Sequence, residues 1–207
     1  MIKITRSPIP GFLAANAAQW NTDFVQRRTA NPKYQFSWCS YQNKPVNEHL
    51  EPILLEMTAR HCAFCDGYEL GGNIKPTIEH FRPKSRFPSL AYEWANLFPA
   101  CHYCQEKRDE FDEKLLKPDE DDYAFERYFY FENNTGELIP NPQATPADQE
   151  RAAKTIELYR LNGSERRTIC SLRQRCVKQF RAGLYPPNEI TMYPYRYLYQ
   201  VGNEPPI

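Results

Sequence analysis

Apolar residues recur at helical spacing in the first part of the chain. The pattern predicts one helix that ends near Asn31. Its apolar stripe consists of Leu13, Ala17, Trp20 and Phe24. A second helix is predicted from about Leu50 to Arg60, with Pro52 in its first turn. The residues of this helix that face inward are Leu50, Ile53, Leu54 and Met57.

The second half of the chain alternates strand-like and helical patterns. Two short apolar runs flank residues 133–136 (NNTG) and predict a hairpin. Thr145 is predicted to cap one helix, which begins at Pro146 and ends before residues 162–163 (NG). A further helix follows after that stop. The apolar side of that further helix consists of Ile169, Leu172, Cys176 and Phe180. The segment after Gly183 is predicted to be extended. Its alternating tyrosines indicate a strand edge or a docking strip, and they are Tyr193, Tyr195, Tyr197 and Tyr199.

The charge of the chain is balanced overall but uneven along the sequence. There are 26 basic and 26 acidic side chains, so the total gives no indication of nucleic-acid binding. Residues 151–181 carry nine basic residues against two acidic ones, which fits either a solvated helix face or a surface that follows a phosphate backbone. No run of about 18 apolar residues predicts a membrane span. The first residues lack the apolar run of a secretory signal, so a cytoplasmic location is expected.

Four of the seven cysteines form two Cys-x-x-Cys pairs, Cys62 with Cys65 and Cys101 with Cys104. Each tight turn presents two thiolates on one side, and two such turns complete a tetrahedral zinc shell. A shell of four sulfurs leaves no position for water, so the predicted zinc is structural. The remaining cysteines are predicted to be small buried residues, and they are Cys39, Cys170 and Cys176.

Between the two pairs the chain places a carboxylate directly beside a histidine, Glu79 and His80. The carboxylate offers a hard oxygen to Mg²⁺ or Mn²⁺, and the imidazole can take a proton from water near neutral pH. Arg82 and Pro83 follow and predict a turn that lets the two side chains converge. A Glu–His pair by itself is more often a surface pair or a buried histidine, so the surrounding motifs decide its interpretation.

The order of these motifs resembles that of the HNH endonucleases, which have a ββα-metal core flanked by zinc knuckles. A cysteine pair, Glu–His, an asparagine and a second cysteine pair follow one another here as in that family. Residues 78–85 (IEHFRPKS) and 92–97 (YEWANL) are most similar to the HNH proteins of retron and Septu anti-phage systems. The specific motifs lie within residues 62–108, and weaker similarity reaches Gly136 and the 161–162 pair.

The resemblance implies a role for each residue of the motif. His80 matches the general base, and Glu79 matches the acidic ligand of the catalytic cation. Asn96 matches the asparagine that holds the loop between the two strands through backbone hydrogen bonds. Relatives carry asparagine or histidine after the last cysteine as a further metal ligand, and here that residue is Gln105. The four cysteines match the zinc ligands. Arg108 stands where the family has a lysine and is expected to contact the substrate phosphate. Arg82 and Lys84 are further residues expected to contact substrate, with a solvated loop as the equal alternative for Lys84.

The resemblance also implies a reaction and its partners. The expected reaction is metal-dependent hydrolysis of phosphodiester bonds in DNA or RNA, with structural Zn²⁺ and catalytic Mg²⁺ or Mn²⁺. The expected setting is the effector nuclease of a defence complex with an ATPase subunit, and a retron reverse transcriptase with its DNA is a further candidate partner. One alternative is a non-catalytic zinc-binding interaction module of such a complex. A zinc deaminase is a weaker alternative, because it requires His-x-Glu and an open zinc position.

Together these patterns predict an α+β fold. A mostly helical chain is expected around a small ββα-metal HNH core with a structural four-cysteine zinc site. Residues 1–61 are expected to form an N-terminal helical segment and residues 62–116 the nuclease core. Residues 117–207 are expected to contribute the hairpin, the C-terminal helices and a tail rich in tyrosine and proline, all packed on the core.

Overall fold

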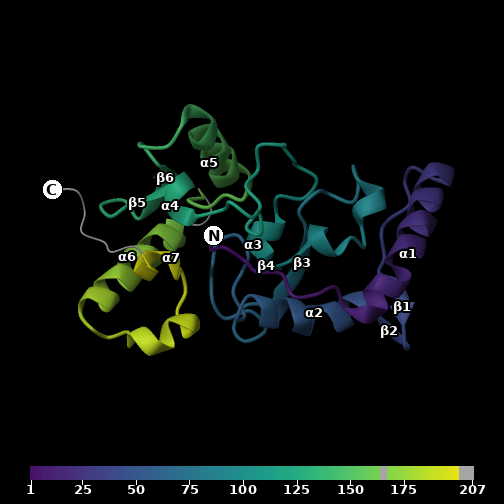
Figure 1. Ribbon diagram of the computed structural model, residues 1–207, viewed down its shortest axis with the longest axis horizontal. Helices are drawn as coiled ribbons and strands as arrows, with labels where there is room; N and C mark the ends of the chain where they lie inside the picture. Colours follow the sequence, from purple (N-terminus) through teal and green to yellow (C-terminus); the bar gives the residue numbers. More distant parts are fainter. Residues whose placement is uncertain (164–166, 201–207) are drawn as a thin grey trace.

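The N-terminal residues form a long helix at one end of the molecule. In this computed structural model, which describes residues 1–163 and 167–200, helix α1 spans Gly11–Ala30 (Figure 1). Leu13 and Phe24 are buried on its inner side, as the apolar stripe predicts. Because the helix ends directly before Asn31, the predicted end is confirmed.

A small hairpin and a second helix follow. These elements are β1 (Ser40–Tyr41), β2 (Lys44–Pro45) and α2 (Val46–Met57). The predicted start of α2 near Leu50 is wrong, because the helix begins one turn earlier. That turn buries Val46 together with Leu50 and Leu54, which lengthens the apolar face of the helix. Pro52 therefore lies inside α2 instead of in its first turn.

A two-stranded sheet followed by a short helix occupies the middle of the molecule (Figure 1). Its elements are β3 (Pro76–His80), β4 (Leu97–Cys101) and α3 (His102–Gln105). The strands are antiparallel, with Pro76 opposite Cys101 and His80 opposite Leu97. The connection between the strands contains two 3₁₀ turns, η1 (Pro88–Leu90) and η2 (Trp94–Asn96). One end of this sheet thus carries the Glu–His pair, and the other leads into the second cysteine pair.

The predicted hairpin and the helix after it are confirmed. The elements are α4 (Phe125–Tyr128), β5 (Phe129–Glu132), β6 (Glu137–Pro140) and α5 (Pro146–Leu158). Gly136 in the hairpin turn has a φ of 77°, and a Cβ there would lie 2.3 Å from the carbonyl oxygen of Cys170. The predicted cap of α5 is also present, since the Asp148 amide donates to Thr145 Oγ1 at 3.2 Å.

The predicted helix with Ile169 and Phe180 on its apolar side is confirmed as α6 (Arg167–Arg181). The segment after Gly183 folds back onto the protein as η3 (Pro187–Met192) and α7 (Tyr197–Gln200), so the prediction that it is extended is wrong for residues 184–200. Residues 201–207, on which that prediction also falls, lie outside the described residues.

The alternating tyrosines form no exposed strip, and three of them are buried, namely Tyr195, Tyr197 and Tyr199. The fully buried Arg173 donates to Tyr197 Oη at 2.9 Å, and Arg196 is paired with the buried Asp66. The Asp66–Arg196 pair joins the segment to the first cysteine turn, and the Arg173–Tyr197 bond joins α6 to α7.

Helices and small sheets therefore pack together with a cluster of four cysteines, in agreement with the α+β class. One group of buried side chains joins the cysteine turns to the C-terminal segment, and a second lies among α1, α2 and the β3–β4 connection. The division at residues 61 and 116 stays a prediction. Within the described ranges, no helix has both the length and the apolar composition that crossing a bilayer requires.

Candidate functional site

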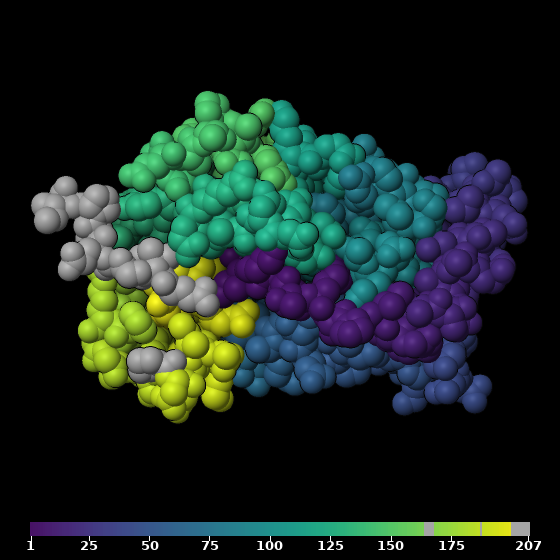
Figure 2. Space-filling model, viewed as in Figure 1, coloured from purple at the N-terminus to yellow at the C-terminus, as the bar shows by residue number. Residues whose placement is uncertain are grey.

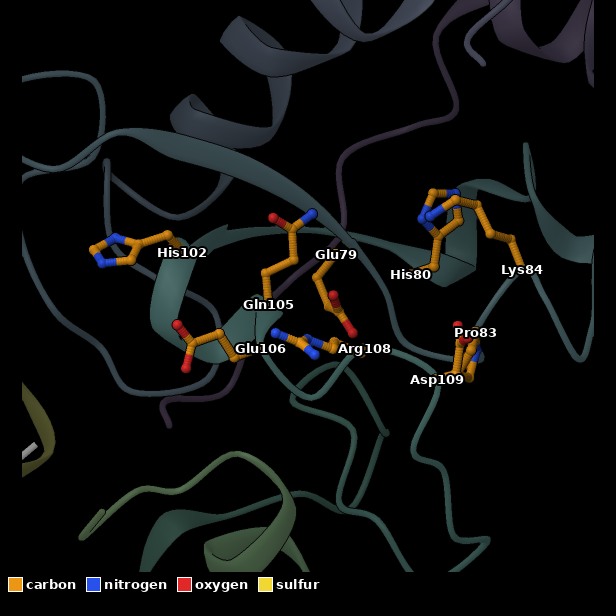
Figure 3. Close-up of a pocket in the computed structure, with 9 residues that line it drawn as sticks. All are labelled: Glu79, His80, Pro83, Lys84, His102, Gln105, Glu106, Arg108 and Asp109. Atoms are coloured by element: carbon orange, nitrogen blue, oxygen red, sulfur yellow. The ribbon is translucent and has the colours of Figure 1, made fainter. Parts of the chain in front are cut away.

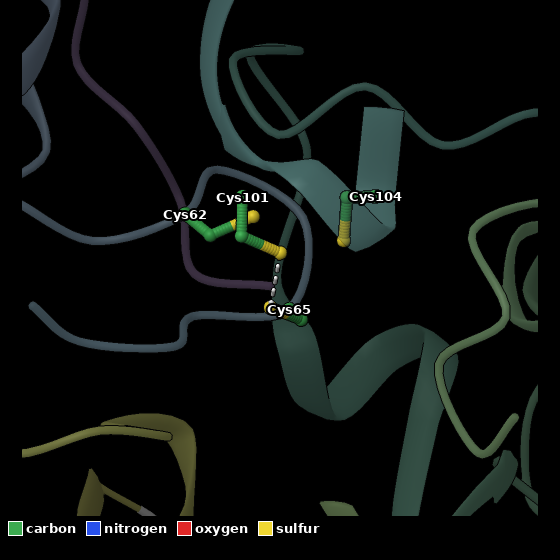
Figure 4. A group of neighbouring side chains, drawn as sticks. All are labelled: Cys62, Cys65, Cys101 and Cys104. Carbon is green, nitrogen blue, oxygen red and sulfur yellow. Dashed lines mark hydrogen bonds between the residues drawn. The ribbon is translucent and has the colours of Figure 1, made fainter. Parts of the chain in front are cut away.

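The four paired cysteines converge at the end of the β3–β4 sheet (Figure 4). All four side chains are buried, and their sulfur atoms all lie within 4.8 Å of one another. The sulfurs of Cys65 and Cys101 are 3.8 Å apart. Four sulfurs at about 2.3 Å from a tetrahedral zinc ion have edges of about 3.8 Å. The cluster is therefore compatible with a structural zinc ion.

Backbone hydrogen bonds shape the first cysteine pair into a tight turn. The Asp66 amide donates to the Cys62 carbonyl, and the Cys62 amide donates to the Gly67 carbonyl, each at 2.9 Å. Burial raises the pKa of the Cys62 and Cys104 thiols well above the ordinary range. A bound cation would offset this cost by stabilising the thiolates, which is how zinc binding and folding become coupled.

A separate cavity of about 400 Å³ lies between β3, α3 and the loops that follow them (Figure 3). Its lining residues are Glu79, His80, Pro83, Lys84, His102, Gln105, Glu106, Arg108 and Asp109. Figure 3 shows Glu79, Gln105 and Arg108 near its centre, with His80 and Lys84 to one side. The structure thus brings these five sequence-predicted residues to one cavity.

The ring of His80 is held by contacts on several sides. Its Nε2 lies 2.9 Å from the carbonyl oxygen of Ala91, so this nitrogen carries the proton and Nδ1 keeps its lone pair. Trp38 stacks on the ring with 5.5 Å between centroids, and Phe36 meets it edge-on, also at 5.5 Å. Burial, reinforced by the charge of Lys84, lowers the pKa of His80 to about 3. The imidazole is therefore neutral at neutral pH.

Glu79 is buried beside a lysine that the sequence patterns did not single out. Lys107 Nζ lies 3.0 Å from Glu79 Oε1, and the lysine side chain is fully buried. The same ammonium donates to the carbonyl oxygens of Phe81 at 3.3 Å and Glu110 at 3.0 Å. Burial raises the pKa of Glu79 to about 7, although Lys107 opposes the rise. Oε1 has this ionic partner but accepts no hydrogen bond of regular geometry, so it retains lone pairs.

Asn96 joins the two ends of the β3–β4 connection. Its Oδ1 accepts from the Arg82 amide at 2.7 Å. Its Nδ2 donates to the carbonyl oxygens of Arg82 and Leu90, each at 3.0 Å. Since Leu90 directly precedes Ala91, this side chain also anchors the segment whose carbonyl accepts from His80.

The side chain of Arg82 does not line the cavity with Glu79 and His80. Its guanidinium donates to both carboxylate oxygens of Glu113, at 2.8 and 2.6 Å, and lies over the ring of Phe111. It borders a second cavity of about 320 Å³ instead. Gln105 does line the first cavity, and its Nε2 donates to the Ile78 carbonyl at 3.3 Å.

Three residues that shape the cavity were missed from the sequence, for different reasons. Lys107 lies in a run rich in acidic residues, and such a run is usually solvated. Phe36 and Trp38 lie in a loop, and nothing in their spacing connects them with His80. The cue in the sequence was the alternation of Tyr34, Phe36 and Trp38 with polar residues.

Similarity to one characterised protein extends over about half of the chain. No protein-family model matches it. Over 114 residues, which are 55% of this chain, it is 29% identical to the Septu protein PtuB of Bacillus thuringiensis. The matched segment covers 39% of that protein's length.

Proposed function

We propose that this chain is a metal-dependent HNH endonuclease that acts in anti-phage defence. The main support for the proposal is that Glu79 and His80 line one cavity, and that a hydrogen bond to Ala91 fixes the tautomer of the His80 ring. The order of the motifs around the cysteine pairs supports the chemistry. The similarity to a Septu protein supports the setting in defence. The fold by itself would support neither the nuclease activity nor the role in defence.

Glu79 and Gln105 are the residues that would hold a catalytic divalent cation. Both offer oxygen atoms, which are the ligands that Mg²⁺ and Mn²⁺ prefer. Glu79 Oε1 accepts no regular hydrogen bond, so its lone pairs suit a metal bond. Mg²⁺ keeps several waters, so one or two protein ligands suffice. When bound, this cation would neutralise the charge that develops on the phosphate and on the leaving oxygen.

The protein itself supplies the base and further positive charge. His80 Nδ1 takes a proton from the attacking water while its Nε2–H stays bonded to Ala91. Hydrolysis of the phosphodiester leaves a 5′ phosphate and a 3′ hydroxyl. Lys84 and Arg108 line the same cavity, which supports the proposal that they contact the substrate phosphate. Arg82 is left out of this set because Glu113 holds its guanidinium.

The proposed setting is a defence complex in the cytoplasm. An ATPase subunit is the proposed partner, and DNA or RNA is the substrate. A complex of the retron type would add a reverse transcriptase and its DNA. The chain's balanced charge fits a substrate that is presented by such partners.

One observation favours a second function, a non-catalytic zinc-binding interaction module. The ammonium of Lys107 already neutralises the Glu79 carboxylate, which lowers its need for a metal ion. Such a module would bind zinc and its partner but cleave nothing.

A cleavage panel separates the two functions. Zinc-loaded protein is incubated with single-stranded DNA, double-stranded DNA and RNA, each with Mg²⁺, with Mn²⁺ and without either. Every reaction is repeated with the candidate ATPase subunit. The nuclease proposal expects cleavage that requires Mg²⁺ or Mn²⁺. Folded, zinc-loaded protein that cuts no substrate under any combination would contradict it and leave the interaction module.

A further inference from the structure

Two segments beside the cavity carry basic residues and no acidic ones. Residues 24–47 contain four basic residues and no acid, and residues 80–92 contain three and no acid. Five of these cations form what we call the cationic flank, namely Arg27, Arg28, Lys33, Lys84 and Arg86. Uniform sign over two segments far apart in sequence produces a local positive field although the whole chain is neutral.

Side-chain contacts make this flank continuous with the cavity. Lys84 lines the cavity, and its Nζ lies 5.1 Å from the centre of the Phe36 ring, which meets His80. Arg28 reaches from the end of α1 to the carbonyl oxygen of Ser85 at 3.5 Å. The next residue, Arg86, is exposed. A path of positive charge therefore leads from the cavity to the end of α1.

The outer part of the path is formed by the last turn of α1 and the loop after it. Arg27 and Lys33 are exposed, and Arg27 Nη1 donates to Tyr34 Oη at 2.8 Å. The Tyr34 carbonyl in turn accepts from Arg28 at 3.2 Å. Basic residues in a last turn favour the helix dipole. That effect accounts for the two arginines but not for Lys33 or for the cations of the 80–92 segment.

The cations of the flank differ in their ionic partners from several cations in the C-terminal half. There, Arg127, Arg151, Lys154, Arg160 and Arg196 are bound to carboxylates. Among the residues that the structure describes, neither the five cations of the flank nor the exposed cations of α6 form an ion pair with a carboxylate, although Glu79 and Asp109 attract the ammonium of Lys84. The charge of the exposed Arg27, Lys33 and Arg86 is therefore available to an external anion, and their position beside the cavity distinguishes them from the α6 cations.

We propose that the cationic flank binds the phosphodiester backbone of a nucleic acid and leads it to the cavity. The ligand class rests on the proposed nuclease function. The contacts are with phosphates, so they supply affinity and direction without reading bases. The described cations of α6 do not provide such a path. This helix lies at the end of the molecule opposite α1 (Figures 1 and 2).

The test compares two triple variants with the same change in net charge. Variant one is Arg27→Gln, Lys33→Gln and Arg86→Gln, all at exposed residues of the flank. Variant two is Arg175→Gln, Lys178→Gln and Arg181→Gln, all at exposed residues of α6. Binding of labelled 20-nucleotide single-stranded DNA, duplex DNA and RNA is followed by fluorescence anisotropy without Mg²⁺ or Mn²⁺. Circular dichroism and zinc content verify folding, and Lys33→Gln alone serves if the triple variant is unstable.

The flank variant should weaken binding about tenfold or more at about 50 mM salt, and reduce the slope of log affinity against log salt by about 2 to 3. The α6 variant should bind like the unmodified protein. The three labelled probes then identify which backbone the flank prefers. Equal losses in both variants, or no loss in the flank variant, would overturn the proposal. So would displacement of the probes by poly-glutamate at lower concentrations than by unlabelled nucleic acid of equal charge, since that would indicate an acidic protein as ligand.

These outcomes are separate from those of the cleavage panel. Binding that depends on the flank without any cleavage would support this inference and count against the nuclease. Cleavage by a protein whose binding is unaffected by the flank substitutions would support the nuclease and count against this inference.

Discussion

The cysteine cluster and the cavity differ in how many metal ligands they provide, although the β3–β4 sheet and α3 contribute to both. The cluster brings four buried sulfurs within 4.8 Å, a full set of ligands for one zinc ion. The cavity has Glu79 and Gln105 as its two proposed metal ligands and leaves about 400 Å³ of open space. A closed shell fits a structural role, whereas an incomplete one leaves room for water and a phosphate.

The two regions also hold their charges differently. At the cluster, burial raises the pKa of thiols that only a cation can keep ionised. At the cavity, a lysine of the protein itself neutralises the buried carboxylate. The first region is thus expected to need its metal for folding, and the second to fold without one. The following predictions test that contrast, from the largest effect to the smallest.

Loss of one cluster cysteine should have the largest effect. Cys62→Ala opens the sulfur shell, and zinc binding contributes on the order of 10 kcal/mol to the folding of such sites. We expect loss of bound zinc and of cooperative unfolding, measured by metal analysis and by circular dichroism. Cys176→Ala is the matched control, because Cys176 is also buried but lies outside the cluster. Retention of zinc by Cys62→Ala would contradict the role of the cluster.

Breaking the buried ion pair at the cavity should cost less. Lys107→Met leaves the Glu79 carboxylate without its counter-charge, and such losses typically cost about 3 to 5 kcal/mol. The double variant Glu79→Gln/Lys107→Met removes both charges and should regain most of that stability in urea unfolding. Zinc content should stay unchanged in both variants. Additive losses in the double variant would show that the two residues are not coupled.

Removal of the Asn96 amide should have a smaller effect on stability. Asn96→Ala deletes three hydrogen bonds to the backbone, each worth about 0.5 to 1.5 kcal/mol. Cleavage should also slow, because the segment that holds His80 Nε2 loses its anchor. Urea unfolding and single-turnover cleavage measure the two effects. Unchanged cleavage at reduced stability would limit Asn96 to a role in folding.

The smallest effect is expected for an arginine outside the cavity. Arg82→Gln removes an exposed ion pair with Glu113, and such pairs contribute at most about 1 kcal/mol. Its cleavage rate should stay close to that of the unmodified protein, whereas Arg108→Gln, inside the cavity, should be slower. If Arg82→Gln cleaved more slowly than Arg108→Gln, Arg82 would contact the substrate after all.

Local patterns explain which parts of this structure could be predicted from the sequence. The cap at Thr145 and the hairpin turn at Gly136 depend on neighbouring residues, and both formed where the sequence indicates. The cysteine cluster was also predictable, because ligand spacing restricts how two pairs can share one ion. Glu79 and His80 stood out as an adjacent pair in the sequence, whereas Gln105 and Arg108 came from the HNH resemblance and not from spacing alone.

The remaining features depend on contacts between distant residues. The segment after Gly183 folds back because Asp66 binds Arg196, which is 130 residues away, and because Arg173 of α6 binds Tyr197. An alternating row of tyrosines fits an exposed strand equally well until those partners are known. The burial of Lys107 is similar, since a lysine in an acidic run carries no sign of a carboxylate behind it.

The central claim is that His80 acts as the base of a metal-dependent nuclease. Its most direct test is the single-turnover cleavage rate of His80→Ala at saturating Mg²⁺ or Mn²⁺, with His49→Ala as the control outside the cavity. General-base catalysis predicts a loss of about 100- to 10,000-fold for His80→Ala, with zinc content and circular dichroism unchanged. Cleavage by a folded His80→Ala variant at the rate of the unmodified protein would contradict the claim.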